Sequence, residues 1–207
     1  MKNEVMYALS YGLFVLSARR GEKDNGCITN TAIQVTTTPN RIAVAVNKSN
    51  YTHDMVKETG RFTVSVLSQE AKFDLFQRFG FQSGRDVDKF AGFEEYTRRD
   101  ASGVCYVTQG ANAWMSCKVV SATDLGTHTL FLADVEDGDV LSSAPSATYA
   151  YYQANIKPRP AAAPAPAGDK KRWVCKVCGY VYEGESLPAD FICPWCKHPA
   201  SDFEPLE

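Results

Sequence analysis

The chain has 207 residues, of which 44% are hydrophobic and 22% are charged, and its formal net charge is -2. This composition excludes wholesale disorder, and 22 basic against 24 acidic side chains without a basic block argue against a protein that coats nucleic acid. No apolar run approaches the roughly 20 residues that span a bilayer. Because the first residues also lack the pattern of a signal peptide, we expect a cytoplasmic protein without membrane partners.

Residues 1–156 carry the period-2 alternation of β-strands. Residues 42–46 and 62–66 each place three apolar side chains on one face, and a further strand is predicted at 114–120. Residues 127–135 are apolar on both sides, which predicts a strand covered on both faces. Many strands with few helices predict a mainly β fold, a barrel or sandwich with peripheral helices.

Two short helices are predicted between these strands. Thr52 is the predicted N-cap of the first, which should run to about Thr59 and end at Gly60. Ser68 is the predicted N-cap of the second, which carries phenylalanines at i, i+3 spacing and should end at Gly80.

Residues 157–171, KPRPAAAPAPAGDKK, lack apolar periodicity and are mostly Pro and Ala. Such a composition favours an extended, semi-stiff spacer. We therefore expect three parts: a domain over residues 1–156, a linker over 157–171 and a small domain over 172–207.

The small domain contains two C-x2-C pairs, Cys175 with Cys178 and Cys193 with Cys196. Four thiolates in this spacing suit one tetrahedral ion, either zinc or iron. Because 36 residues hardly bury a core of their own, we expect the metal to be what folds this domain.

The residues around these pairs, CKVCGYVYEGE and CPWCKHPASDFE, resemble the rubredoxin family in the short form found in rubrerythrin-type proteins. The resemblance implies one iron held by the four cysteines. Gly179 and Gly184 suit tight turns, and His198 is predicted to form a hydrogen bond and not to ligate the metal. Aromatic residues supply the predicted core, namely Trp173, Tyr180, Tyr182, Phe191, Trp195 and Phe203.

Two polar segments of the first domain are candidate binding sites. One follows the strand at 42–46 and enters the first helix, where free N–H groups and polar side chains suit an anion such as phosphate; it comprises Asn47, Lys48, Ser49, Thr52 and His53. The other has short polar side chains that let a planar ring approach the backbone; it comprises Asn30, Thr31, Thr36, Thr37 and Thr38. A solvated loop and an exposed threonine-rich strand are the alternatives.

CITNTAIQVTTTPNRIAVAVNKSNYTHDMV, FTVSVLS, SGRDVDKFAGF and GTHTLFLADVEDG, in this order, resemble the flavin reductase family. The resemblance implies an FMN-binding split β-barrel, usually a homodimer with the flavin near the subunit interface. It implies that the five polar residues of the first segment, Asn47, Lys48, Ser49, Thr52 and His53, hold the FMN phosphate. It also implies that Asn30, Thr31 and Thr36 to Thr38 contact the ring or the ribityl chain. His128 would face the nicotinamide or the flavin, although a structural histidine at a strand start is an equal alternative.

No G-x-G-x-x-G follows a strand, so a Rossmann domain is excluded and NAD(P)H is expected to bind transiently over the flavin. Neither a nucleophile elbow nor a P-loop is present. We expect no essential acid or base among the side chains, because the cofactors carry the chemistry. Cys27, Cys105 and Cys117 have no ligand spacing and are interpreted as small buried hydrophobes.

A flavin reductase-like domain, a tether and a rubredoxin-like domain in one chain resemble the high-molecular-weight rubredoxins of anaerobic bacteria. That resemblance implies an oxidoreductase that passes electrons from NAD(P)H through FMN to the Fe(Cys)4 centre, and then to a flavodiiron-type oxygen or nitric oxide reductase. Two alternatives stay open: a flavin-binding electron carrier without NAD(P)H activity, and a flavin-binding domain with a zinc ribbon for docking.

Overall fold

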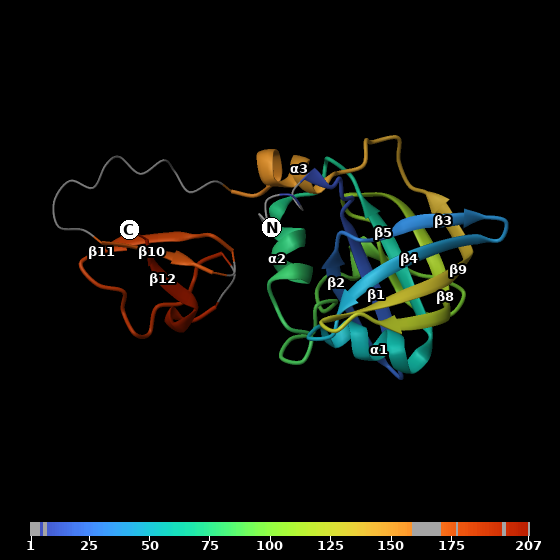
Figure 1. Ribbon diagram of the computed structural model, residues 1–207, viewed down its shortest axis with the longest axis horizontal. Helices are drawn as coiled ribbons and strands as arrows, with labels where there is room; N and C mark the ends of the chain where they lie inside the picture. The colour runs from blue at the N-terminus through green and yellow to red at the C-terminus, as the bar shows by residue number, and fades with distance from the viewer. Residues whose placement is uncertain (1–4, 6–7, 159–170, 177, 196–197, 207) are drawn as a thin grey trace. The chain divides into compact units, whose positions relative to one another are not determined.

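The computed structural model describes residue 5 and residues 8–158, 171–176, 178–195 and 198–206 (Figure 1). It divides the chain into two compact units, residues 1–156 and residues 157–207. Most of the predicted linker, residues 159–170, and the predicted ligand Cys196 lie outside the described residues. Within the described ranges, no helix is long and apolar enough to cross a membrane.

The first unit is built on a seven-stranded antiparallel sheet in the order β2-β1-β5-β8-β9-β4-β3 (Figure 1). Its strands are β1 (Phe14–Arg20), β2 (Lys23–Thr29), β3 (Ile33–Thr37), β4 (Asn40–Asn47), β5 (Arg61–Leu67), β8 (Ala111–Asp124) and β9 (His128–Val140). A separate pair is formed by β6 (Thr97–Arg99) and β7 (Cys105–Val107). The helical segments are α1 (Tyr51–Thr59), α2 (Phe73–Gly80), η2 (Glu94–Tyr96), α3 (Tyr149–Tyr151) and η3 (Tyr152–Ile156). The prediction of a mainly β fold with peripheral helices is confirmed.

The connection between β2 and β3 shows that the sheet is curled into a barrel. These two strands are the opposite edges of the sheet. A flat sheet of seven strands would separate its edges by about 29 Å. The chain passes from Thr29 to Ile33 in four residues, which span at most about 14 Å. The two edges therefore lie close together, and the Thr31 Oγ1 hydroxyl donates to the carbonyl of Ala45 on β4 at 2.8 Å.

Period-2 alternation sorts the side chains of β1 into two cores. Because successive side chains point to opposite faces, Leu16 packs into one cluster with Val44 of β4 and Met55 of α1. Val15 lies in the other cluster with Phe76 of α2. Both faces of β1 are therefore buried. One face packs against side chains of β4 and α1, and the other packs against α2.

The helix N-caps differ from the prediction. Asn50 precedes α1 and Lys72 precedes α2, so the assignments of Thr52 and Ser68 as N-caps were wrong. Thr52 lies inside the first turn of α1 and is fully buried, and the N–H of Ser68 bonds to the carbonyl of Gly110 in an extended segment. The predicted end of α1 is confirmed, since Gly60 adopts the left-handed φ of 68°.

The strand predicted at 127–135 is part of β9, but only one of its faces is buried. Thr129, Phe131 and Ala133 are buried, whereas Leu130 and Leu132 are only partly covered. The prediction that both faces are covered was wrong, because the leucine face of this strand remains partly exposed.

The second unit contains a three-stranded antiparallel sheet in the order β11-β10-β12. Its elements are β10 (Lys171–Cys175), β11 (Val181–Gly184), η4 (Ala200–Asp202) and β12 (Phe203–Leu206). Phe191 is a centre of ring contacts, with centroids 4.6 Å from Tyr182 and 5.4 Å from Phe203. Trp173 contacts Tyr182, and Tyr180 contacts Trp195. The predicted aromatic residues therefore contact one another, although Phe203 is the one of the six that is buried and the other five are partly exposed.

Candidate functional site

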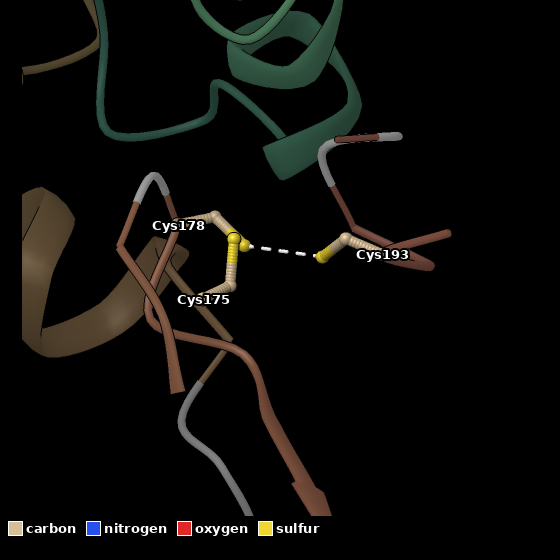
Figure 2. Close-up of side chains that lie close together, drawn as sticks. All are labelled: Cys175, Cys178 and Cys193. Carbon is tan, nitrogen blue, oxygen red and sulfur yellow. Dashed lines mark hydrogen bonds between the residues drawn. The ribbon is translucent and has the colours of Figure 1, made fainter. Parts of the chain in front are cut away.

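Three cysteine sulfurs converge in the second unit. Figure 2 shows Cys175 and Cys178 on one loop facing Cys193 on another. Their sulfur atoms all lie within 4.8 Å of one another, and the Sγ atoms of Cys178 and Cys193 are 3.5 Å apart. Around a tetrahedral ion with bonds of about 2.3 Å, sulfurs lie about 3.8 Å apart. The three side chains are at most 1% exposed, so this thiol set fits one metal ion, with Cys196 as its expected fourth ligand.

Backbone hydrogen bonds shape the two cysteine loops. The N–H of Gly179 donates to the carbonyl of Cys175 at 2.8 Å, and Gly179 has a φ of 80°, which favours glycine. The N–H of Cys193 donates to the carbonyl of His198 at 2.8 Å. Gly179 therefore has its predicted turn role, whereas Gly184 lies at the end of β11 and not in a tight turn.

His198 has a hydrogen-bond partner of its own. Its Nδ1 lies 2.7 Å from the Oδ2 carboxylate oxygen of Asp202. This agrees with the prediction that His198 forms a hydrogen bond.

In the first unit, strand pairing brings two separately predicted site segments together. Asn47 at the end of β4 is the direct partner of His128 at the start of β9. The N–H of Lys48 also donates to the carbonyl of Thr127 at 3.0 Å. The loop that follows β4 therefore lies beside the turn between β8 and β9, with the half-exposed His128 next to it.

Lys48 is held by a residue that the sequence did not indicate. Its Nζ donates to both carboxylate oxygens of Asp124, at 2.6 and 2.7 Å. This bond, together with the N–H of Gly126, lowers the pKa of Asp124. Asp124 was not predicted from the sequence because it lies 76 residues from Lys48 in the chain. The two residues meet because the loop after β4 lies beside the turn between β8 and β9.

The backbone of the loop is ordered by Asn47. Its Oδ1 accepts hydrogen bonds from both the N–H and the hydroxyl of Ser49, each at 2.9 Å. Asn50, the N-cap of α1, makes no side-chain capping bond. The first turn of α1 is thus left without a side-chain cap at its positive end, beside Lys48 and Ser49, which fits a phosphate group.

Thr52 and His53 have inward-facing positions. Thr52 is fully buried and accepts a hydrogen bond from the Asn25 Nδ2 at 2.9 Å. His53 is 4% exposed, and its Nε2 lies 2.9 Å from the hydroxyl of Thr129. Their side chains are therefore directed into the domain and not toward an anion in the loop.

The two parts of the predicted ring site lie at different ends of β4. Thr31 contacts Ala45, two residues or about 7 Å along the strand from Asn47. Thr37, in contrast, pairs with Asn40, seven residues or about 23 Å from Asn47. The structure thus brings the Asn30 and Thr31 segment near the loop, whereas Thr36, Thr37 and Thr38 are exposed at the far end.

A cavity of about 400 Å³ lies toward that far end. Its walls come from the starts of β1 and β4, from β3 and from the middle of β8 and β9, namely Phe14, Ala32, Ile33, Gln34, Asn40, Arg41, Ile42, Met115 and Val135. None of the predicted site residues lines it.

Comparisons with known proteins agree with both units. The flavin reductase like domain matches residues 6–159, and the rubrerythrin, rubredoxin-like domain matches residues 173–204. The chain therefore belongs to the flavin reductase family and carries a rubredoxin-like domain. It is 33% identical to the high molecular weight rubredoxin of Moorella thermoacetica over 231 aligned positions that cover all of both chains.

A further relative and a solved structure each match part of the chain. The ferric-chelate reductase (NAD(P)H) of Archaeoglobus fulgidus is 43% identical over 152 residues, which cover 73% of this chain and 89% of the relative. The FMN-binding protein from Thermus thermophilus with bound 1-cyclohex-2-enone superposes with a TM-score of 0.59 at 23% identity, covering 65% of this chain and 73% of that one. The predicted split-barrel fold is confirmed. The protein is an electron-transfer oxidoreductase, and FMN and iron are the cofactors of its two domains.

Proposed function

We propose that the chain passes electrons from NAD(P)H through FMN to an Fe(Cys)4 centre, and from there to an acceptor protein such as a flavodiiron oxygen or nitric oxide reductase. The observation that carries this proposal is the presence of a flavin reductase-like domain and a buried rubredoxin-like thiol cluster in one chain. The relatives support it, since one is a high molecular weight rubredoxin and another a NAD(P)H-dependent reductase.

The loop after β4 is the proposed site of the FMN phosphate. Lys48 supplies a cation and Ser49 a hydroxyl, and the start of α1 supplies the positive end of a helix that lacks a side-chain cap. Asp124 holds the Lys48 ammonium at the loop, so binding requires little reorganisation of that side chain.

Asn30 and Thr31 are proposed to contact the ribityl chain or the ring edge, because Thr31 bonds to Ala45 near the end of β4 that leads into the phosphate loop, and Asn30 precedes Thr31 in the chain. His128 is proposed to meet the nicotinamide, since it is half-exposed beside Asn47. We assign no flavin contact within one protomer to the exposed Thr36, Thr37 and Thr38.

The four cysteines are proposed to hold the iron, with Cys196 completing the set. When bound, FMN accepts an electron pair as hydride and releases single electrons, which matches a one-electron iron centre to a two-electron donor. The protein's part is to bind, orient and shield the two centres, and no side chain is assigned as an essential acid or base.

The proposal is tested by adding NADH or NADPH without oxygen to the chain loaded with FMN and iron. We expect the flavin absorption to bleach first and the ferric tetrathiolate absorption to follow. In Cys178→Ser, which removes a buried ligand, the flavin should still bleach but the iron signal should be absent. Cys117→Ser, a buried cysteine of the first unit, serves as the matched control and should retain both signals.

Two results would contradict the proposal. A chain that is colourless apart from flavin and contains zinc would have a docking module and no electron-transfer centre. A chain whose flavin is not reduced by either nicotinamide would be a carrier reduced by another protein.

A further inference from the structure

The start of α1 is fastened to the barrel by two buried hydrogen bonds. On one side, Asn25 of β2, which is 2% exposed, donates its Nδ2–H to the hydroxyl of Thr52. On the other side, His53 contacts the hydroxyl of Thr129 of β9, which is 7% exposed. The first turn of α1 is thereby connected to strands that are separated by three others in the sheet order.

The geometry determines which atom of His53 donates. Its Nδ1 lies 3.1 Å from the Oδ1 of Asp54, whose other oxygen accepts from Arg85 at 2.7 Å. Arg85, followed by His53, lowers the pKa of Asp54, so this carboxylate is ionised and acts as an acceptor. The Nδ1 therefore carries a proton, and in the neutral ring Nε2 accepts the hydroxyl proton of Thr129.

Thr129 is next to the proposed binding site along the chain. It follows His128 directly and pairs with Val46, the residue before Asn47. The bond from Thr129 to His53 thus joins the strand that carries His128 to the helix that the loop enters. A loop anchored at Asn47 and at the first turn of α1 has little freedom to move its N–H groups.

We propose that Thr52 and His53 are positioning residues, which hold the loop of residues 47–50 against β9 so that it is preformed for a phosphate group. They act through Asn25 and Thr129 and do not touch the phosphate. This rests on the proposed function, because it assumes that the loop binds the FMN phosphate.

The test compares FMN with riboflavin, which has the same ring but no phosphate. We expect wild-type protein to bind FMN more tightly than riboflavin, and Lys48→Ala to reduce this preference. Thr129→Val should weaken FMN binding by about tenfold while changing riboflavin binding by less than about twofold. Thr129→Ser, which keeps the hydroxyl, should restore FMN binding.

Thr63→Val is the matched control. Thr63 is also fully buried on a strand, and its hydroxyl donates to the carbonyl of Cys105 at 2.6 Å. The Thr63→Val substitution therefore removes a similar hydrogen bond at a similar structural cost without touching α1. Amide hydrogen exchange of residues 47–51 in the flavin-free protein should accelerate in Thr129→Val and not in Thr63→Val.

The outcomes separate the two proposals. If the wild type shows no preference for FMN, or Lys48→Ala keeps it, the phosphate site is wrong and the positioning role with it. If both behave as expected but Thr129→Val keeps the preference, or weakens both flavins equally, only the positioning role is overturned. Thr52→Val removes the second bond and is subject to the same criteria should Thr129→Val not fold.

Discussion

Lys89 is the residue at which burial and charge conflict most directly. It is 4% exposed, and its Nζ donates to the carbonyls of Gly26 and Phe79 at 2.9 and 3.0 Å. Gly26 lies on β2, an edge strand of the sheet, so Lys89 bonds to the backbone of an edge strand. Desolvation lowers the pKa of Lys89 to about 8, against a smaller opposing effect of Cys27.

The lowered pKa predicts how stability changes with pH. In the unfolded chain the lysine keeps its proton up to about pH 10.5, whereas in the folded protein it loses it near pH 8. Between these values the unfolded chain binds more protons, so rising pH favours the folded state. From about pH 7.5 to about pH 9.5, wild type should gain about 2 kcal/mol in free energy of unfolding relative to Lys89→Met, measured by urea unfolding.

The exposed Lys57 of α1 provides the control for this measurement. Lys57→Met should follow the wild-type pH dependence. Parallel curves for wild type and Lys89→Met would show that Lys89 keeps an ordinary pKa in the folded protein.

Burial also explains the raised pKa values of the three cysteines of the first unit. It raises the pKa of Cys105 to about 11 and that of Cys117 to about 12. It raises the pKa of the buried Cys27 as well. They are neutral thiols near pH 7, which agrees with their interpretation as small hydrophobes.

At the scale of elements, Thr31 bonds to the backbone of β4 where the barrel closes. Its hydroxyl donates to the carbonyl of Ala45 and also accepts from the Ala45 N–H at 3.2 Å. A single side chain thus takes the place of a strand-pairing bond where the two edges of the sheet approach each other. The sequence predicted Thr31 as a flavin contact and did not predict its bonds to Ala45.

We therefore predict that Thr31→Val lowers the free energy of unfolding of flavin-free protein by about 1 kcal/mol, because the partly buried N–H and carbonyl of Ala45 lose their partner. Thr31→Ser should retain most of the stability. Thr36→Val is the control, since the Thr36 hydroxyl bonds locally to the carbonyl of Pro39 on an exposed turn. A Thr31→Val protein as stable as wild type would mean that the barrel closes without this bond.

At the scale of the whole molecule, we propose that the Pro- and Ala-rich segment of residues 157–171 is a tether that makes electron transfer between the two domains intramolecular. A short tether between two sites holds them at an effective concentration on the order of millimolar. Residues 157–171 carry a net charge of +3, whereas residues 172–207 carry -3 before any metal is counted.

A protease site inserted at Ala163 allows one preparation to be compared before and after cutting. We predict that cutting leaves the rate of flavin reduction by NADH unchanged. Iron reduction should become slower at about micromolar protein and should then rise with protein concentration. The uncut insertion variant is the control, and iron reduction that stays fast and independent of concentration after cutting would contradict the role of the tether.

The sequence alone determined the chemistry that is local in the chain. Two C-x2-C pairs define a metal site because each pair supplies two ligands from one short loop, and alternation defines strands because side chains point to opposite faces at every second residue. The end of α1 was also predictable from the local sequence, since Gly60 supplies a left-handed φ that other residues avoid.

Only the tertiary structure decided which of the polar residues point into the domain and which remain at its surface. Thr52 and Lys48 are four residues apart, yet the first is buried against Asn25 and the second is held at the surface by Asp124. Pairing of β4 with β9 placed His128 beside Asn47, and curling of the sheet placed Thr31 beside Ala45. These contacts join residues far apart in sequence, so they depend on strand order and register, which a local pattern does not contain.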